Sequence, residues 1–295
     1  MYEVLKVSLM FSTLFALLFL NVPMAFAFAI TAIIFAALFL PPPMLSLVYD
    51  QLFSTVNSWV FIAVPLFVFM GAILEKSGAG EEIAAGIPRL VGRVPGSLAI
   101  TAILTGYMIG TMSAVLAPAI IVNTLLLLPS MIRRGYNPTV AIGSVLVGGS
   151  LPQIVPPSLI LVVYGTVVGV SVAKLFAGGL IVGTFLAVGY IIFIIIWGYR
   201  YRNRMGSREI SEELAVRDRL TAIKYLAGPF GIALGVLGSI LLGIATPTEA
   251  SSVGALLALI YALGRRKLNK NKLREALDTT LRTSCMAIWL VYGGN

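Results

Sequence analysis

The sequence predicts an all-α, polytopic integral membrane protein. Of the 295 residues, 59% are hydrophobic and only 11% are charged, and the mean hydropathy is +0.98. A soluble domain carries about 25% charged residues. Several uncharged runs are long enough to cross the hydrocarbon core of a bilayer, which takes about 20 residues of helix. Short alternating segments, which would indicate a β-barrel, do not occur.

The composition also limits the chemistry that the chain can carry. It has no histidine, so a HExxH zinc site and a serine–histidine pair are both impossible. The single cysteine, Cys285, lies in an apolar run and is expected to be an inert, buried thiol. We therefore expect a protein that is not an enzyme and holds no cofactor. The net charge of +9 is compatible with nucleic acid or with cytoplasmic loops, and the positions of the charges decide between them.

Residues 1–74 are predicted to form an N-terminal unit of scaffold helices. Residues 4–20 form a first span, "NVP" at 21–23 a turn, and residues 24–40 a second span that ends at "PPP". Residues 44–56 carry Leu45, Val48, Leu52 and Val56 at helical spacing, which predicts an amphipathic helix at the interface. Residues 57–74 cross again.

Residues 75–208 are predicted to form a second unit. Residues 75–96 are rich in charge and glycine and form an interfacial arm. Residues 97–132 form a helical hairpin with its tip at "GTMSA" (110–114). Arg93 and Arg133, at its two ends, both belong on the cytoplasmic side, so the hairpin is either complete or re-entrant. A discontinuous helix (138–169) and a return helix (175–198) follow.

Residues 209–295 are predicted to be the start of a second, inverted repeat that is incomplete. A charged arm (209–220) precedes spans at 223–244 and 251–264, which are joined by "TPTEA". Leu273, Leu277 and Leu281 mark an interfacial helix, and a last span begins near Ser284. With this topology, all basic residues except Lys6 and Lys174 lie on one side. That asymmetry is typical of cytoplasmic loops and excludes nucleic acid as a partner.

The order of elements is the same in the first and third units: span, proline turn, span, interfacial helix, span. The orientation is opposite, because the Pro23 turn is cytoplasmic and the Pro247 turn is outside. Inverted repeats are typical of secondary transporters, whose sites lie at the repeat interface near the membrane midplane. The sequence therefore predicts an ion-transporter-like fold with a re-entrant hairpin and a discontinuous helix.

The stretch "GGSLPQIVPPS" (148–158) interrupts an apolar segment and predicts the binding site. Prolines remove N–H donors, and broken backbone survives in a membrane only where it is buried or lines a cavity. Freed carbonyls suit sodium, and the N-termini of half-helices suit an anion. A structural proline kink is the alternative. The candidate sodium and substrate residues are Thr111, Ser113, Asn123, Gly148, Gly149, Ser150, Pro152, Pro156, Pro157 and Ser158, with Gln153 as a further oxygen source.

Other features have simpler interpretations. Gly148 and Gly149 are expected to let the chain turn sharply. The pairs Gly165/Gly169 and Gly179/Gly183 are expected to serve close helix packing. Glu249 is expected to act at the start of a helix, with Thr246 or Thr248 as the cap, rather than as an ion ligand.

Five stretches give the chain a family resemblance. "FIAVPLFVFMGAILEKSG" (61–78), "SMIRRGYNPTVAIGS" (130–144), "PQIVPPSLILVVYG" (152–165), "GVSVAKLFAGG" (169–179) and "GIATPTEASSVGALLALIYAL" (243–263) resemble the large, DctM-like permease subunit of tripartite ATP-independent periplasmic (TRAP) transporters. The match follows the order of almost the whole chain.

The resemblance implies a sodium-driven elevator importer in the inner membrane that takes up an organic acid anion, such as a dicarboxylate. It also implies two partners, a small membrane subunit and a periplasmic solute-binding protein. In the family, sodium lies where the hairpin tip meets the broken helix, which corresponds here to Thr111, Ser113, Gly149 and Pro152.

Two departures from the family pattern stand out. The tip reads "GTMSAVLA", so that Met112 replaces a glycine and Ala117 stands where the family has an acid. We also expect the chain to be truncated at its C-terminus, without a second hairpin. A stand-alone sodium–anion symporter of related fold and an inactive fragment remain alternatives.

Overall fold

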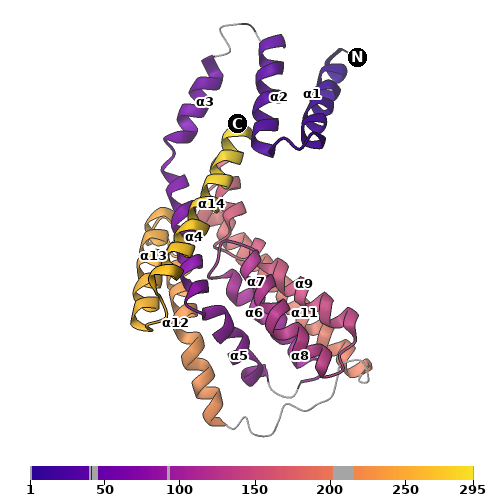
Figure 1. Ribbon diagram of the computed structural model, residues 1–295, viewed down its shortest axis with the longest axis vertical. Helices are drawn as coiled ribbons and strands as arrows, with labels where there is room; N and C mark the ends of the chain where they lie inside the picture. The colour runs from indigo at the N-terminus through magenta and orange to yellow at the C-terminus, as the bar shows by residue number, and fades with distance from the viewer. Residues whose placement is uncertain (1, 40, 42–45, 92–93, 202–215, 295) are drawn as a thin grey trace.

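The computed structural model describes residues 2–39, 41, 46–91, 94–201 and 216–294, and throughout these ranges the regular elements are helical (Figure 1). The all-α, polytopic fold predicted from composition is therefore confirmed. The helices are α1 (Tyr2–Phe19), α2 (Met24–Phe39), α3 (Ser46–Val56), α4 (Ala63–Lys76), α5 (Ala79–Val91), α6 (Ser97–Gly110), α7 (Ala117–Val122), α8 (Leu128–Arg133), α9 (Pro138–Ser150), α10 (Leu159–Val168), α11 (Val172–Arg200), α12 (Val216–Leu241), α13 (Pro247–Gly264) and α14 (Lys270–Gly294).

Three apolar segments have at least the 18 residues needed to cross a membrane: Trp59–Lys76, Val172–Arg200 and Pro247–Gly264. The first combines a short 3₁₀ turn (Trp59–Ile62) with α4. The chain also has shorter apolar helices, among them α1, α2, α6 and α10. The many large apolar side chains on the surface are expected for helices whose solvent is lipid.

Apolar helices are present at both predicted N-terminal spans, although each is shorter than the three segments named above, and the turn between them has a clear cause. Asn21 adopts a left-handed conformation with φ of 60°, and Pro23 directly precedes α2. Asparagine tolerates this region better than most residues, and proline suits the start of a helix.

Some predicted positions lie outside the described residues. These are Leu45 of the amphipathic pattern, Arg93, Arg202, Arg204, Arg208 and most of the arm predicted at 209–220.

The charged arm contains a packed helix, α5. One of its faces carries Glu81, Glu82 and Arg89, and the opposite face buries Ile83 and Ile87. That buried face packs against α12 and α6. The arm therefore joins the N-terminal helices to the hairpin through a rigid element rather than a loop.

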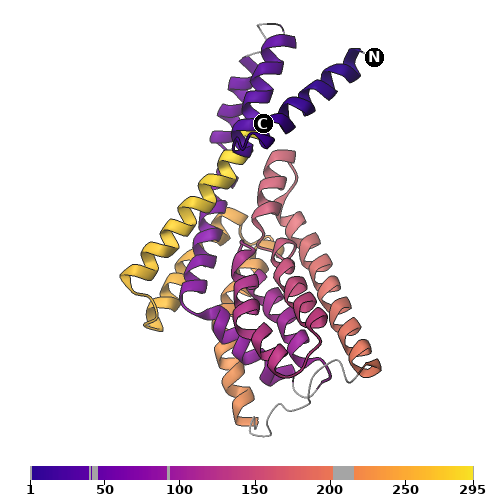
Figure 2. The same ribbon diagram turned by 45° about the vertical axis from the view of Figure 1, so that its right-hand side comes forward.

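The C-terminal helix differs from the prediction. An interfacial helix followed by a separate span near Ser284 was expected, but α14 runs without a break over 25 residues, as Figure 2 shows. No proline or glycine interrupts the sequence between Lys270 and Tyr292, so nothing stops the helix at Ser284. Cys285 lies on an exposed face of α14, so the expectation of a buried thiol was wrong.

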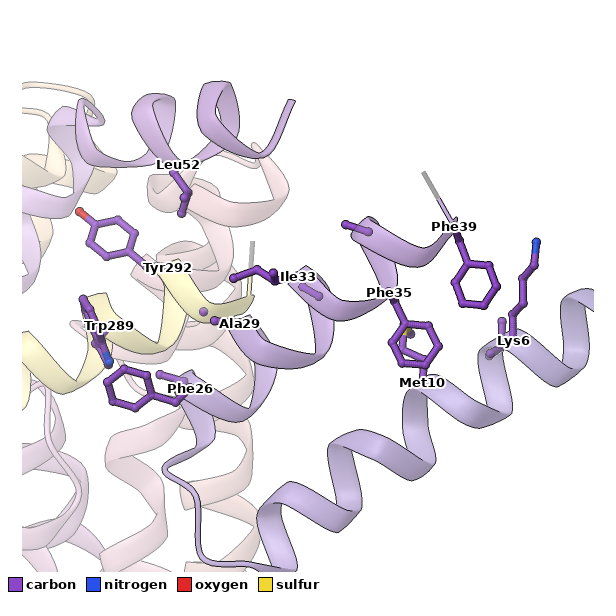
Figure 3. Close-up of a pocket in the computed structure, with 15 residues that line it drawn as sticks. Lys6, Met10, Phe26, Ala29, Ile33, Phe35, Phe39, Leu52, Trp289 and Tyr292 are labelled. Atoms are coloured by element: carbon purple, nitrogen blue, oxygen red, sulfur yellow. The ribbon is translucent and has the colours of Figure 1, made fainter. Parts of the chain in front are cut away.

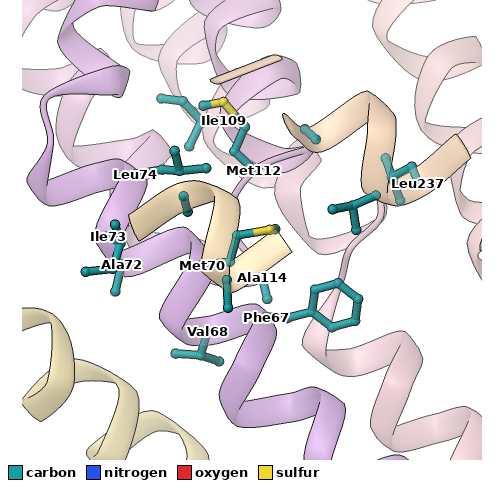
Figure 4. Packing of buried hydrophobic residues seen from close by; sticks show 14 of the residues in the cluster. Phe67, Val68, Met70, Ala72, Ile73, Leu74, Ile109, Met112, Ala114 and Leu237 are labelled. Atoms are coloured by element: carbon teal, nitrogen blue, oxygen red, sulfur yellow. The ribbon is translucent and has the colours of Figure 1, made fainter. Parts of the chain in front are cut away.

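The core forms around α4. Its residues Phe67, Met70 and Ile73 are almost completely buried, and α13 and α14 pack along it. Figure 4 shows that Met112 and Ala114 from the hairpin tip and Leu237 from α12 join the same cluster. Gly254 of α13 permits this close packing, because a Cβ there would lie 2.7 Å from the sulfur of Met70.

The first and last groups of helices run in opposite directions. In Figure 1, α1 descends and α2 rises, whereas α12 rises and α13 descends. The contacts correspond as well: α2 packs on α14, and α13 packs on α4. The assignment of these groups to inverted repeats, with unit boundaries at residues 74 and 208, stays a prediction.

Replacing Phe67 with alanine tests the importance of this core. Phe67 is 1% exposed and meets Phe176 of α11 edge-on, with ring centroids 6.0 Å apart. The cavity left by Phe67→Ala should lower the free energy of unfolding by about 3 kcal/mol. Thermal unfolding in detergent measures the loss. Phe185→Ala, at a site that is 77% exposed, is the control, and equal losses in both variants would contradict the packing described here.

Candidate functional site

The predicted hairpin is present, and its first limb is shorter than a bilayer-spanning helix. Its first limb is α6, and its second limb consists of α7, a π-helical turn (Asn123–Leu127) and α8. With 14 residues, α6 is about 21 Å long, whereas the hydrocarbon core is about 30 Å thick. The geometry therefore favours the re-entrant form over a complete hairpin, with the tip at the depth of buried protein rather than at a water interface.

Tyr136 closes the base of the hairpin. Its buried hydroxyl accepts a hydrogen bond from the backbone N–H of Leu98, at 3.3 Å, in the first turn of α6. Burial raises the pKa of the Tyr136 phenol, and the hydrogen bond from Leu98 opposes part of that shift. The neutral phenol thus supplies an acceptor to an N–H that has no partner within its own helix.

The discontinuous helix breaks where the sequence predicted. α9 ends at Ser150, a 3₁₀ turn covers Leu151–Gln153, and α10 begins at Leu159. Ser158 directly precedes α10 and donates its hydroxyl to the carbonyl of Gln153, at 2.7 Å. Pro152 has no N–H, so it cannot donate to the carbonyl of Gly148 as a helical residue would.

Gly148 and Gly149 do not make the turn, contrary to expectation. Both lie in the last turn of α9, where they allow close approach of the hairpin. A Cβ on Gly148 would lie 2.2 Å from the carbonyl oxygen of Ala102, and one on Gly149 would lie 2.5 Å from Ile120. α9 therefore contacts both limbs of the hairpin through glycine.

The first limb contributes two matching glycines. A Cβ on Gly106 would lie 1.8 Å from the Gly148 carbonyl oxygen, and one on Gly110 would lie 2.9 Å from the Cα of Pro152. Backbone thus meets backbone between α6 and the broken helix, and the end of α6 reaches the break. Sequence reasoning missed these two residues, although their spacing of four on an apolar helix is the signal of a close-packing face.

The residues of the tip face in different directions. The hydroxyl of Thr111 donates to the carbonyl of Met108, at 2.7 Å. Ser113 pairs with the backbone of Val115 at 3.3 Å and lies against α4, where a Cβ on Gly71 would be 2.8 Å from its Cα. The buried tip is therefore packed between the scaffold helix α4 and the broken helix.

Asn123 lies at the centre of the hairpin and is fully buried. Its Nδ2 donates to the carbonyl of Ala102, at 3.0 Å, whereas its Oδ1 has no partner. The hydroxyl of Thr105, one turn from Ala102, also has none. Together with the Gly148 carbonyl, these atoms are oxygens that regular helical bonding does not use. They lie where the hairpin meets the broken helix, a site that we call the hairpin–break junction.

The remaining predicted residues divide between the junction and its edges. Pro152, Pro156, Pro157 and Ser158 are buried in the break. Ser150 is exposed, and its hydroxyl bonds to Val147 of its own helix at 2.9 Å. The structure therefore does not bring the Ser150 hydroxyl to the other candidates.

Helix α11 covers the break from the other side. A Cβ on Gly179 would lie 2.6 Å from the carbonyl oxygen of Ile154, and one on Gly183 would lie 2.6 Å from Val155. The expectation that this pair serves close packing is confirmed. It was wrong for Gly169, which ends α10 with a positive φ of 72°.

Glu249 acts as a helix cap, as expected. Its carboxylate accepts hydrogen bonds from the N–H and hydroxyl of Thr246, both at 2.8 Å, and the Thr246 hydroxyl accepts from the N–H of Glu249. This reciprocal capping box accounts for both side chains at the start of α13.

The chemistry offered by the junction is that of neutral oxygens. Within the described ranges, no three His, Cys, Asp or Glu side chains gather as they would around a transition metal.

The large hollow of about 740 Å³ between α1, α2 and α14 is lined almost entirely by apolar side chains, with Lys6 at its rim (Figure 3). Its lining does not suit an organic anion, so the junction remains the better candidate.

The family model described as "Tripartite ATP-independent periplasmic transporter, DctM component" matches residues 11–295. The chain belongs to this family. TRAP permeases are transporters rather than enzymes, and the helical architecture makes this permease chain an integral membrane protein.

Individual relatives are similar along most of the chain. The uncharacterized protein YgiK of Salmonella typhimurium is 27% identical over 96% of this chain and 64% of its own length. The C4-dicarboxylate TRAP transporter large permease protein DctM of Vibrio cholerae is 26% identical over 88% of this chain and 56% of its own. The ectoine TRAP permease TeaC of Halomonas elongata is 23% identical over 86% and 58%. The chain thus spans less than two thirds of the length of these relatives.

Met112, one departure of this TRAP permease from the expected tip pattern, has a structural role. Its side chain is 3% exposed and packs in the core cluster around α4, beside Ile109 and Leu74 in Figure 4. A glycine would leave that space empty. Met112 therefore packs the hairpin tip against the scaffold helix α4.

Substitution of Gly106 tests the backbone contact between α6 and α9. The added methyl group of Gly106→Ala would collide with the Gly148 carbonyl, so we expect the hairpin to shift and the protein to lose about 2 kcal/mol of stability. Thermal unfolding measures it. Gly143→Ala, in α9 with no atom within 4 Å of the added Cβ, is the control and should be neutral or slightly stabilising. An equally tolerated Gly106→Ala would contradict the contact.

Replacing the Tyr136 hydroxyl tests the base of the hairpin. Tyr136→Phe leaves the N–H of Leu98 without its acceptor, at a cost of about 1–3 kcal/mol. Hydrogen exchange should therefore be faster over the first turn of α6. The control is Tyr164→Phe, whose side chain is exposed. Unchanged protection in Tyr136→Phe would show that another group satisfies Leu98.

Proposed function

We propose that this chain acts in the large permease subunit of a sodium-coupled TRAP-type secondary transporter, which imports an organic acid anion across the inner membrane by an elevator mechanism. The observation that carries the proposal is the junction of a short hairpin with a broken helix. Family membership supports a role in transport, and the chemistry of the junction supports sodium coupling and an anionic substrate.

Sodium fits the oxygens that the junction supplies. The break removes helical donors at Pro152, Pro156 and Pro157, and the hydroxyls of Thr111 and Ser113 lie at the tip. Sodium is a hard cation that takes carbonyl and hydroxyl oxygens as ligands. Binding there would offset the cost of keeping such oxygens in a low-dielectric interior.

An anion fits the beginnings of the half-helices. α7 begins at Ala117 and α10 at Leu159, each directly after an irregular segment of the junction. The first N–H groups of a helix have no internal acceptor and carry partial positive charge. Of these two helix starts, that of α10 is the better candidate, because α10 is the longer helix and adjoins the break.

The substrate is proposed only as a class. Relatives are named for C4-dicarboxylate, ectoine and isethionate transport, so membership of the family does not select one compound. We propose an organic acid anion, with a dicarboxylate as one possibility. The partners proposed are a small membrane subunit and a periplasmic solute-binding protein that delivers the substrate.

Two substitutions test the site in the complete transporter that contains this chain. Ser113→Ala removes a hydroxyl at the tip, and Pro156→Ala restores an N–H donor in the break. Removal of a hydroxyl ligand, or occupation of a carbonyl ligand by the new N–H, should lower the apparent affinity for sodium in uptake about tenfold while membrane insertion stays normal. Initial uptake rates at varied sodium concentration measure this.

Ser130→Ala, in the same hairpin but at its base, provides the matched control. Unchanged sodium dependence in both site variants would remove the site assignment. Full uptake without any binding protein would instead favour a stand-alone symporter.

A further inference from the structure

A second hollow, whose lining includes no residue of the hairpin or of the broken helix, is rich in positive charge. It has a volume of about 680 Å³ and opens between α5 and the loop that joins α13 to α14. Four basic and two acidic side chains line it: Arg89, Arg265, Lys267, Lys272, Glu81 and Glu82. This basic hollow plays no part in the function proposed above.

Two of the four basic side chains share one carboxylate. The Glu82 carboxylate, with only 12% of its side chain exposed, forms ion pairs with Arg265 and Lys267. The hydroxyl of Tyr261 lies 3.5 Å from the same carboxylate. This cluster holds α5 against the end of α13 and fixes one wall of the hollow.

The other basic side chains lack such a partner. Arg89 of α5 and Lys272 of α14 are half-buried, and neither forms an ion pair within the ranges that the structure describes. Glu81, the remaining acid, is exposed. A half-buried cation without a counter-ion loses hydration without compensation, so the hollow is prepared for an added negative group.

The position of the hollow indicates where that group comes from. The membrane-crossing segments Trp59–Lys76 and Pro247–Gly264 both end beside it, at Ser77 and Arg265. It therefore lies at the boundary of the bilayer, on the side where basic residues predominate. Basic hollows between helices at this level bind the headgroups of anionic lipids.

We propose that the basic hollow binds a phosphate-bearing anion, most directly the headgroup of an anionic phospholipid in the cytoplasmic leaflet, through Arg89 and Lys272. A volume of about 680 Å³ admits a headgroup with its glycerol. The guanidinium of Arg89 binds phosphate oxygens through two N–H groups, and Lys272 adds a point charge. The proposal depends on membrane insertion and is independent of sodium coupling.

Bound lipid would strengthen a contact that the chain already makes between α5 and the α13–α14 region. Arg89 lies on α5, which leads directly into the hairpin, and Lys272 lies in the first turn of α14. A phosphate held by both side chains joins these two helices next to the Glu82 cluster. The bound state should therefore be more resistant to heat than the lipid-free state.

The test compares two double variants of the complete protein in detergent. Arg89→Gln with Lys272→Gln removes the two proposed ligands. Lys270→Gln with Arg274→Gln removes the same charge from exposed positions of α14 that do not line the hollow. Binding of short-chain phosphatidylglycerol, phosphatidylcholine and inorganic phosphate is measured by titration and by the shift of the unfolding temperature.

We expect phosphatidylglycerol, but not phosphatidylcholine, to stabilise the wild type and the control, with affinity about tenfold lower in the hollow variant. Stabilisation by phosphatidylglycerol alone identifies the lipid as the source of the phosphate. An effect of inorganic phosphate alone supports the site and assigns it to a soluble ligand. Equal loss in both double variants, or no anion effect in the wild type, overturns the proposal. If the double variant fails to fold, Lys272→Gln compared with Lys270→Gln gives the same test with one charge removed from each.

Discussion

The cost of an unpaired backbone group in hydrocarbon is the constraint on which the rest of this structure depends. Pro152, Pro156 and Pro157 interrupt helical bonding in an apolar segment, and such a break persists only inside protein. α6 packs on the preceding turn through Gly106 and reaches the break through Gly110, and α11 covers the break through Gly179 and Gly183. Glycine recurs in these positions because it lets a neighbouring helix approach within backbone contact and exclude lipid.

The same arrangement links the junction to the scaffold. The hairpin tip is held on one face by the broken helix and on the other by α4, through Ser113 against Gly71 and through Met112 in the core. α4 in turn carries α13 and α14. The helix at the centre of the core is thus also the support of the site, so stability and function share residues in this chain.

Much of the architecture follows from patterns that the sequence displays directly. Apolar runs, "PPP" and the "GGSLPQIVPPS" stretch located the spans, their ends and the break. What sequence reasoning missed was the set of tertiary contacts. The role of Gly148 depends on which helix lies opposite, and the direction of Ser113 depends on how the tip packs. The prediction of two separate helices within the range of α14 failed for a different reason. An amphipathic half and an apolar half can belong to one helix when nothing between them breaks it.

The contact between α6 and α9 has a mechanical consequence. Two backbones that touch through glycine have no side chain between them to change rotamer, so a displacement of one helix passes undiminished to the other. The hairpin and α9 therefore form one stiff unit. The segment that precedes this unit contains Gly96, whose left-handed conformation a residue with a Cβ would adopt only under strain.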